Sequence, residues 1–361
     1  MSHYEERLEN DLTRIRSSVS DMAAKVETAV KNAMHALHTG NQKLAAATIL
    51  ADHPINRDMR RIDKLCHGFI ALHLPSAGHL RLLSSVIRAN IELERIGDYA
   101  VTIARESLQL SSPPRGPLAT ELERVGNETQ IMLRQAITSF NELNADKARA
   151  TMVMEEQMEN DLDLIYGELM ANDERDAVKN LLTIFAVFTQ LKRVADQAKN
   201  LCEEAVFAAT GDMKAPKVYN ILFVDEDNSC QSQMAAAIAS KNFPGSGIYT
   251  SAGRQPATGV NAEMAGFLER HGISLEGAKP AALDLTPLEL TRQHVIVSLQ
   301  GPVSSYFDKI PFHTTPLEWD IAPAPEQGDA AAFEAWLEDI YRDMAVQIRD
   351  LMELLRGEGA P

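Results

Sequence analysis

From Glu5 to about Ala209, the hydrophobic pattern is helical with few interruptions. Apolar residues recur at spacings of three and four, as at Met22, Val26, Ala29, Val30, Ala33 and Leu37. Glycine and proline are confined to short connectors near residues 39–41, 75–78 and 111–117. The pattern therefore predicts about six long helices separated by these connectors.

After Pro216 the period of the pattern changes. The apolar run Val218–Val224 ends at Asp225 and is typical of a buried parallel strand. Further runs alternate with helical segments: runs at Gly247–Ser251, His294–Leu299 and Phe312–Leu317, and helices at Gln231–Lys241, Asn261–His271 and Ala330–Arg356. This alternation predicts an α/β domain with an open parallel sheet over residues 217–361, covered by helices on both faces.

The helical part contains an internal repeat. Ile91–Ser107 aligns with Phe188–Ala205, and residues 47–63 align with residues 150–166. The alignment places Arg95, Asp98 and Ala100 opposite Arg193, Asp196 and Ala198. We therefore expect an all-α domain over residues 1–213 that uses a three-helix bundle twice, about 1–112 and about 117–212.

Composition narrows the class of protein. The chain has 361 residues, of which 45% are hydrophobic and 24% charged, which excludes a disordered or fibrous protein. Its net charge of −16 disfavours nucleic acid and anionic lipid as general partners. The three cysteines are far apart, so they form neither a disulfide framework nor a CxxC zinc site. Without a signal-like N-terminus or a membrane-length apolar run, we expect a cytoplasmic protein with no direct membrane insertion.

Two carboxylates in the predicted helix from Gly78 to Leu110 are candidates for a metal site. Glu94 and Asp98 are four residues apart and share a helix face, where like charges destabilise the helix unless a cation lies between them. That cation could be a hard metal ion, which prefers carboxylate ligands, or a neighbouring Arg61, Lys64 or Arg95. The spacing alone favours an ordinary charged or salt-bridged face over a metal site.

The longer string from Glu94 to Ala104, Glu-Arg-Ile-Gly-Asp-x-Ala-x-x-Ile-Ala, resembles the PhoU family of phosphate-signalling regulators, and the resemblance covers residues 1–212. It implies twin three-helix bundles, with a divalent or iron-type metal ion on the E/DxxxD motif at Glu94 and Asp98. The resemblance also implies two partners, the phosphate ABC transporter ATPase and a sensor histidine kinase. With these partners, members of the family repress the phosphate-starvation response. Relatives often dimerise, so we expect a homodimer.

The second repeat departs from the family motif. Asp196 and Asn200 match it, but Lys192 stands where the first acidic residue belongs. An ammonium group one helical turn from Asp196 neutralises that carboxylate and repels a divalent cation. We therefore expect no metal at Asp196, and in the first repeat Asn56 is a weaker additional ligand than a carboxylate.

The segment that follows Val224 can be interpreted in three ways. Asp225-Glu226-Asp227 after a strand resembles a receiver domain or an aspartate-nucleophile phosphohydrolase, but both need acidic or lysine partners that later strands lack. Asn228-Ser229-Cys230-x-Ser232, with Ser251-Ala252-Gly253 later, resembles the low-molecular-weight protein tyrosine phosphatase and arsenate reductase family from about Lys217 to Leu355. In that family a C-x5-R loop wraps an oxyanion with backbone N–H groups, its cysteine attacks, and its arginine holds phosphoryl oxygens.

Both essential positions of that loop differ here. Asp225 stands at the nucleophile position, Gln231 at the arginine position, and Cys230 matches only the secondary cysteine of the loop. Gln300 replaces a redox cysteine, and the stretch around Asp320 lacks the Asp-Pro pair of the general-acid loop. The phosphate-loop remnant comprises Asp225, Asn228, Cys230, Gln231 and Ser232. We expect no catalytic residue among them, and we hypothesise that the Asp225 carboxylate lies in the amide cradle as a built-in anion.

These observations predict a regulator of phosphate transport and phosphate-starvation signalling that acts by protein contact and carries a pseudo-phosphatase domain. The alternative is a divergent protein tyrosine phosphatase or arsenate reductase that the helical domain regulates. Activity on p-nitrophenyl phosphate, or on arsenate with thioredoxin, distinguishes the two.

Overall fold

The computed structural model describes residues 3–155, 178–214, 216–275, 277–325 and 330–357. The chain divides into two compact units, Met1–Lys214 and Ala215–Pro361. The first unit is helical and the second has a central parallel sheet, as the change of hydrophobic period predicts. None of the helices described in either unit is both long and apolar enough to cross a bilayer.

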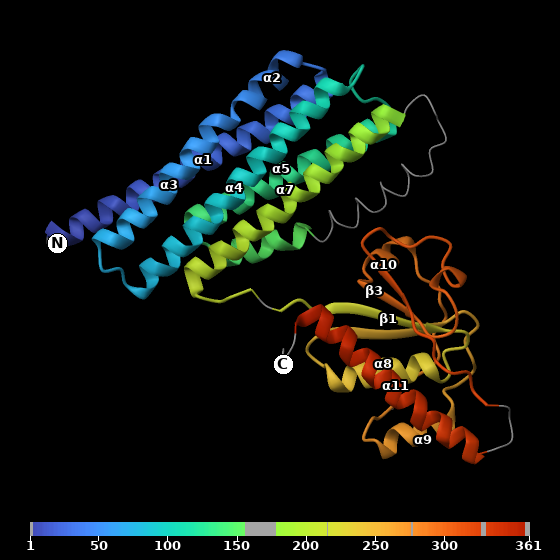
Figure 1. Cartoon of the computed structure of the whole chain (residues 1–361). Helices are drawn as coiled ribbons and strands as arrows, with labels where there is room; N and C mark the ends of the chain where they lie inside the picture. Colours follow the sequence, from blue (N-terminus) through green and yellow to red (C-terminus); the bar gives the residue numbers. More distant parts are fainter. Residues whose placement is uncertain (1–2, 156–177, 215, 276, 326–329, 358–361) are drawn as a thin grey trace. The chain divides into compact units, whose positions relative to one another are not determined.

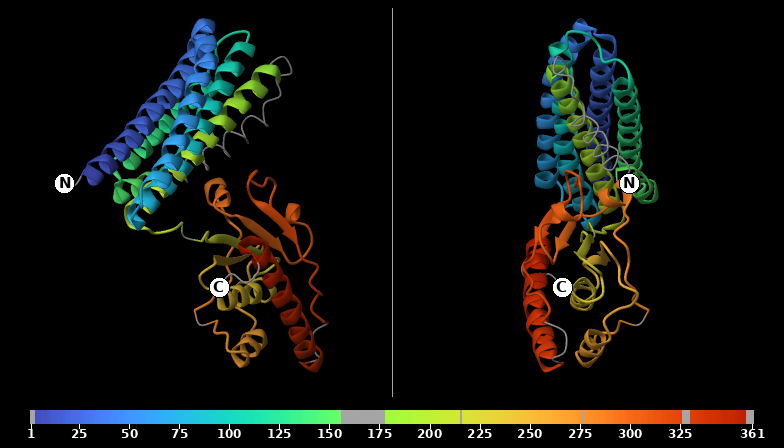
Figure 2. Two further views of the ribbon diagram at one scale, coloured as in Figure 1. Left: turned by 60° about the vertical axis from the view of Figure 1, so that its left-hand side comes forward. Right: turned by 90° about the vertical axis from the view of Figure 1, so that its right-hand side faces the viewer.

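The helical unit is an elongated bundle whose helices run side by side (Figures 1 and 2). Its described helices are α1 (His3–Thr39), α2 (Gln42–Leu50), α3 (Asp52–Leu72), α4 (Ala77–Gln109), α5 (Pro117–Glu142) and α7 (Val178–Thr210). Helix α4 packs against α1 and α7, and α5 packs against α7. The aligned segment 150–166 of the second repeat lies mostly beyond residue 155, outside the described residues.

The prediction of about six long helices missed one break. Helix α2 has 9 residues and is separated from α3 only by Ala51. Pro54 lies in the first turn of α3, where a residue without an N–H loses no helical hydrogen bond. Because Pro54 could not continue α2 without such a loss, a new helix begins here.

An apolar stripe on each helix forms the core of this unit. Met22, Val26 and Val30 of α1 are fully buried, as the three- and four-residue spacing predicts. Cys66 and Cys202 are also fully buried within the same core, and burial raises the pKa of each thiol to about 12. These two cysteines therefore behave as small hydrophobic residues.

Within its described residues, the α/β unit has four parallel strands in the order β2-β1-β3-β4. The strands are β1 (Tyr219–Asp225), β2 (Gly247–Gly253), β3 (Val295–Ser298) and β4 (Thr315–Glu318). Its helices are α8 (Gln231–Asn242), α9 (Ala262–Arg270), α10 (Pro287–Thr291) and α11 (Ala330–Arg356), with a 3-10 turn at Val303–Ser305. Since β1 lies between β2 and β3, the loop after Asp225 opens where the connections leave in opposite directions, a common place for ligand sites.

The two faces of the sheet are covered unequally. Ile221 and Phe223 face a core that includes side chains of α8, α9 and α11. Leu222 and Val224 face a smaller cluster containing Leu290 of α10. Helices do cover both faces, as predicted, but the second face is covered by one short helix, the 3-10 turn and loops.

The edge strand β4 begins later than predicted. Residues 311–314 form a turn, and the Phe312 side chain is 73% exposed, so its hydrophobicity does not mark a strand. The N–H of Thr315 in β4 donates to His294 O, and the N–H of Trp319, directly after β4, donates to Ser298 O. The backbone N–H groups of neighbouring strand residues point to opposite sides of the strand. Since the N–H of Thr315 points to β3, the backbone nitrogen of Pro316 points away from β3.

Candidate functional site

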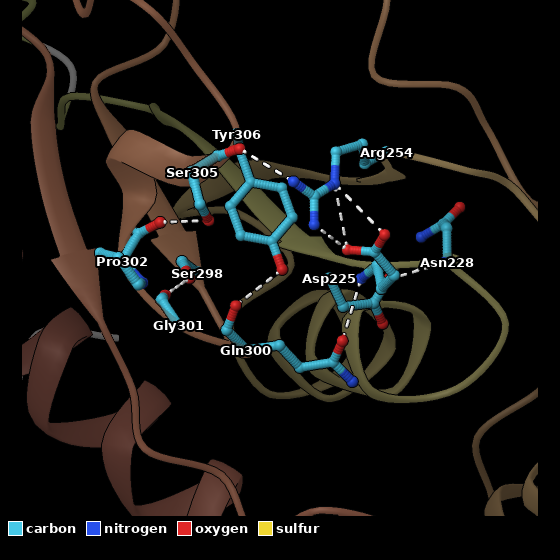
Figure 3. Close-up of polar contacts among 10 residues, drawn as sticks. Asp225, Asn228, Arg254, Ser298, Gln300, Gly301, Pro302, Ser305 and Tyr306 are labelled. Carbon is cyan, nitrogen blue, oxygen red and sulfur yellow. Dashed lines mark hydrogen bonds and ion pairs between the residues drawn. The ribbon is translucent and has the colours of Figure 1, made fainter.

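Asp225 is the last residue of β1, and its side chain is held by the loop that follows. It is 1% exposed. Its Oδ1 accepts a hydrogen bond from the backbone N–H of Asn228 at 2.6 Å (Figure 3). Its Oδ2 accepts one from the N–H of Ser232 at 2.8 Å. The carboxylate therefore lies inside the ring of amides at the start of α8, where an oxyanion binds in loops of this kind.

Asn228 fixes the shape of the loop. Its φ of 52° is in the left-handed region, which asparagine tolerates better than most residues. The side chain is fully buried: Nδ2 donates to Ser232 Oγ at 2.7 Å, while Oδ1 accepts from Gln233 Nε2 and from the N–H of Ala281. Gly253 passes so close that a Cβ there would lie 2.6 Å from the Asn228 nitrogen. The loop is therefore rigidly supported from two sides.

The pKa of the Asp225 carboxyl group is raised. Burial is the main cause, the hydrogen bonds from Ser232 and Asn228 act in the opposite direction, and the negative charge of Asp227 raises the pKa further. Both carboxylate oxygens accept an N–H, and such hydrogen bonds are stronger when the acceptor is ionised. The hydrogen-bond geometry therefore fits the ionised form.

Gln231 stands at the position of the arginine, and both ends of its side-chain amide form hydrogen bonds within the protein. Its Nε2 donates to the carbonyl oxygen of Ala322 at 3.1 Å, and its Oε1 accepts from Gln300 Nε2 at 2.8 Å. The Oε1 of Gln300 in turn accepts the N–H of Glu226 at 3.1 Å. Two neutral amides thus connect the loop to the residues that follow β3 and β4.

Arg254 lies at the outer rim of the loop. Arg254 Nη2 lies 2.6 Å from Glu226 Oε2, and its Nε also contacts that carboxylate (Figure 3). Its guanidinium group lies 5.5 Å from the centre of the Tyr306 ring, and the Tyr306 hydroxyl donates to Gln300 O. The positive charge of Arg254 is therefore paired with a carboxylate of the loop itself.

A cavity of about 630 Å³ lies beside the loop. Its described lining residues include four carboxylates, two glutamines and two aromatic rings, and no lysine or arginine: Asp225, Glu226, Asp227, Glu263, Gln231, Gln300, Phe333 and Trp336. A space of this size at the carboxyl end of a sheet suits a small ligand or a side chain. Its charge is the opposite of what a phosphoryl group requires.

Cys230 is the remaining cysteine, and Asp320 is the candidate general acid. Burial, followed by the charges of Asp225 and Asp227, raises the pKa of the Cys230 thiol to about 12, so it stays protonated at neutral pH. Asp320 is exposed, while its neighbours Trp319 and Ile321 are buried. The side chain of Asp320 is not among the described residues that line the cavity.

In the helical unit, Glu94 and Asp98 are joined by Asp52, a third carboxylate from the start of α3. Burial raises the pKa of both Glu94 and Asp98, and the charge of Asp52 raises them further. Asp52 Oδ2 accepts a hydrogen bond from Asn56 Nδ2 at 2.7 Å, whereas its Oδ1 is buried without a partner. Sequence reasoning missed Asp52, although its place one helical turn before Asn56 was a usable signal.

The cations named as alternatives to a metal are only partly engaged with these carboxylates. Arg61 pairs with Asp58 at 3.1 Å, and Arg95 contacts Glu92 at 3.6 Å, although Arg95 also lowers the pKa of Glu94. Within the described ranges, no group of three or more potential ligands is placed to hold one ion as the side chains stand.

In the second repeat, Lys192 Nζ lies 3.4 Å from Asp196 Oδ1. The two groups therefore form the ion pair that their four-residue spacing suggests. Asn200 donates a side-chain hydrogen bond to Glu92 of the first repeat, which lowers the pKa of that carboxyl group against the larger effect of burial.

Comparisons with known proteins match the two units of the chain to two different families. Residues 19–107 and residues 122–205 match the PhoU domain, and residues 220–348 match the low molecular weight phosphotyrosine protein phosphatase family. The α/β unit therefore carries a domain of that phosphatase type.

The helical unit is similar to known proteins along its length. The chain is 29% identical over 211 residues to the phosphate-specific transport system accessory protein PhoU of Escherichia coli, covering 58% of this chain and 88% of that one. The crystal structure of PhoU from Pseudomonas aeruginosa superposes with a TM-score of 0.55 at 30% identity, covering 56% of this chain and 99% of that one. The Pseudomonas aeruginosa homologue of the accessory protein is 30% identical over 213 residues, which are 58% of this chain and 88% of the relative. On this similarity, the chain belongs to the PhoU family.

Proposed function

We propose that this protein regulates phosphate transport and phosphate-starvation signalling by protein contact, and that its α/β unit is a pseudo-phosphatase. The similarity of the helical unit to accessory proteins of phosphate-specific transport systems supports the first part. By family resemblance, its partners are the phosphate transporter ATPase and a sensor histidine kinase, and it acts as a cytoplasmic homodimer that holds the starvation response off.

One observation carries the second part of the proposal: the Asp225 carboxylate already accepts the amides that would bind a phosphoryl group. A second negative charge about 4 Å away would be opposed by about 4 kcal/mol at an effective dielectric constant near 20. Replacing the arginine by Gln231 removes a charge-assisted contact of about 1.5–3 kcal/mol. Together these effects lower phosphate affinity by several orders of magnitude, apart from the missing nucleophile.

Activity assays test the pseudo-phosphatase. The wild-type chain is expected to turn over neither p-nitrophenyl phosphate nor arsenate with thioredoxin. The double variant Asp225→Cys, Gln231→Arg restores both the nucleophile and the anion ligand and is expected to give slow release of p-nitrophenol. Gln231→Arg alone is the matched control, since it restores the charge without the nucleophile. Clear turnover by the wild-type chain would favour the alternative of a divergent enzyme.

Affinity capture tests the partners. The full chain, the transporter ATPase and the kinase are expected to elute together from phosphate-replete cells. A Lys214 truncation that keeps only Met1–Lys214 is expected to retain these contacts if the helical unit makes them. Absence of both partners from replete and from starved cells would contradict the proposal.

We also propose that Glu94 and Asp98 hold one divalent or iron-type metal ion, and that the side chain of Asp52 turns toward it on binding, since no three described carboxylates are placed to hold an ion as the side chains stand. The unpartnered buried Oδ1 of Asp52, together with the pKa values of Glu94 and Asp98, which burial and then the charge of Asp52 raise, fits a site that lacks a cation. Bound there, the ion would neutralise the carboxylates that connect α3 to α4. Metal analysis of the purified chain is expected to show less metal in Asp98→Ala and unchanged metal in Asp196→Ala. Equal metal in all three proteins would remove this proposal.

A further inference from the structure

A basic groove lies between α1 and α3 of the helical unit. It has a volume of about 440 Å³, and its charged lining comes from Arg14 on α1 and from Arg61 and Lys64 on α3. Asp11 is the one acidic residue among the described lining residues, and its Oδ2 lies 2.9 Å from His73 Nε2. The groove is therefore a positively charged surface on a chain whose net charge is −16.

Arg14, Arg61 and Lys64 outnumber Asp11 among the described lining residues, so the groove itself carries a net positive charge. Arg61 contacts Asp58, but Asp58 is also held by Lys25 at 2.5 Å, and the Arg61 side chain remains 53% exposed. Arg57 lies four residues before Arg61 and extends the basic row along the same face of α3. Acidic side chains farther away than about 8–10 Å are screened at physiological ionic strength, so the local charge decides what approaches this face.

The groove ends in exposed apolar side chains. Leu72, which lines it, is 70% exposed, and Leu74 beyond the end of α3 is 94% exposed. The N–H of Leu74 donates to the hydroxyl of Tyr4 at 3.2 Å, so the start of α1 and the end of α3 meet at one end of the bundle (Figure 1). Gly68 meets no atom within 4 Å of the position of a Cβ, so the groove stays open between its basic and apolar parts.

We propose that this face of α1 and α3 binds the surface of a membrane containing anionic phospholipids. The phosphate of a lipid headgroup lies in the groove between Arg14, Arg61 and Lys64, and Leu72 and Leu74 enter the boundary with the acyl chains. A basic row that leads into exposed leucines and a tyrosine is the side-chain order of a peripheral membrane surface. An acidic peptide would satisfy the charges and leave the two leucines in water, so the apolar end favours lipid. This inference is independent of the proposed regulatory function.

Vesicle flotation of the full chain tests the proposal. The protein is expected to float with vesicles containing phosphatidylglycerol, to stay behind with pure phosphatidylcholine, and to lose binding as salt is raised. The double variant Arg61→Gln, Lys64→Gln is expected to bind about 30-fold more weakly, since each basic residue near an anionic surface contributes about a fivefold gain in binding. The double variant Leu72→Ser, Leu74→Ser keeps the charges and is expected to bind more weakly at every salt concentration.

A matched control keeps the test specific. Arg134→Gln with Arg342→Gln removes the same charge from side chains that are 63% and 71% exposed on α5 and α11, and it is expected to bind like the wild type. Circular dichroism of each variant verifies folding. The proposal is overturned if anionic vesicles do not bind, or if the control loses as much binding as the groove variant. It is also overturned if inorganic phosphate at constant ionic strength releases the protein, or if polyglutamate binds in place of vesicles.

Discussion

Replacing Asp225 by alanine tests the role of the built-in carboxylate directly. The change leaves the N–H groups of Asn228 and Ser232 without their acceptor, and each unsatisfied buried donor costs about 1–3 kcal/mol. Removing a buried charge returns part of this cost, because burial outweighs the hydrogen bonds in the raised pKa of Asp225. The α/β unit is therefore expected to lose about 2–4 kcal/mol of unfolding free energy, or about 6–12 °C in Tm for a domain of this size.

The two tryptophans provide the assay. Both of them, Trp319 and Trp336, are buried in the α/β unit, so tryptophan fluorescence reports the unfolding of this unit in the intact chain. Added phosphate or sulfate is expected to stabilise Asp225→Ala more than the wild type, because the emptied amide cradle can accept an external anion. The difference between the two proteins, rather than the absolute shift, separates binding from the general effect of these salts.

Asp320→Ala is the matched control, since it removes one carboxylate from an exposed position near the same tryptophans. It is expected to leave Tm within about 1 °C of the wild type. If Asp225→Ala is as stable as this control and gains nothing from phosphate, then the carboxylate does not stabilise the loop and the reasoning is refuted.

Three further predictions concern the same unit and its neighbour. Gly253→Ala is expected to disrupt the loop and lower Tm, because its Cβ would lie 2.7 Å from a backbone atom of Asp227 and 2.6 Å from one of Asn228. Gly126→Ala, whose Cβ would meet only the flexible end of the Met34 side chain, is expected to lower Tm less. Equal losses of Tm in the two variants would contradict this contrast. Cys230 is expected to react slowly with iodoacetamide at pH 8, because burial raises the pKa of its thiol to about 12. Mass spectrometry measures the rate of alkylation, and fast labelling would show a thiolate. The pKa of Asp225 is raised in the folded state, so the folded state binds this proton more tightly than the unfolded state does. This contribution to stability is lost as pH rises from the ordinary pKa of 3.8 through the raised folded-state pKa. The unfolding free energy of the wild type relative to Asp225→Asn should therefore fall over this interval in denaturant titrations, and a rise would reverse the assignment.

Much of the fold follows from local pattern. The predicted helix at Ala330–Arg356 has the observed bounds, because its apolar stripe is long and starts and ends at clear breaks. The strand ending at Asp225 was equally clear, since a continuous apolar run fits a strand buried on both faces. The start of β4 was placed too early because Phe312 is hydrophobic and yet exposed in a turn, which local pattern cannot reveal.

The site was only partly predictable. The positions of Asp225 and Gln231 in the loop follow from the motif spacing, whereas the partners of Gln231 come from segments distant in sequence. Gln300 is visible in the sequence as a missing cysteine, but its bridging contacts depend on how β1 and β3 pair. The pairing of Arg254 with Glu226 likewise depends on the close approach of β2, which only the three-dimensional structure supplies.

Pro316 has a consequence for how copies of this protein can associate. An edge strand offers outward N–H groups that allow a foreign strand to join, and this is a common route to aggregation. At Pro316 the outward position has no N–H, so an added strand would lose one hydrogen bond midway along β4. Continuous sheets built through this edge are therefore disfavoured, and chains that crowd at high concentration are protected there from polymerising strand by strand.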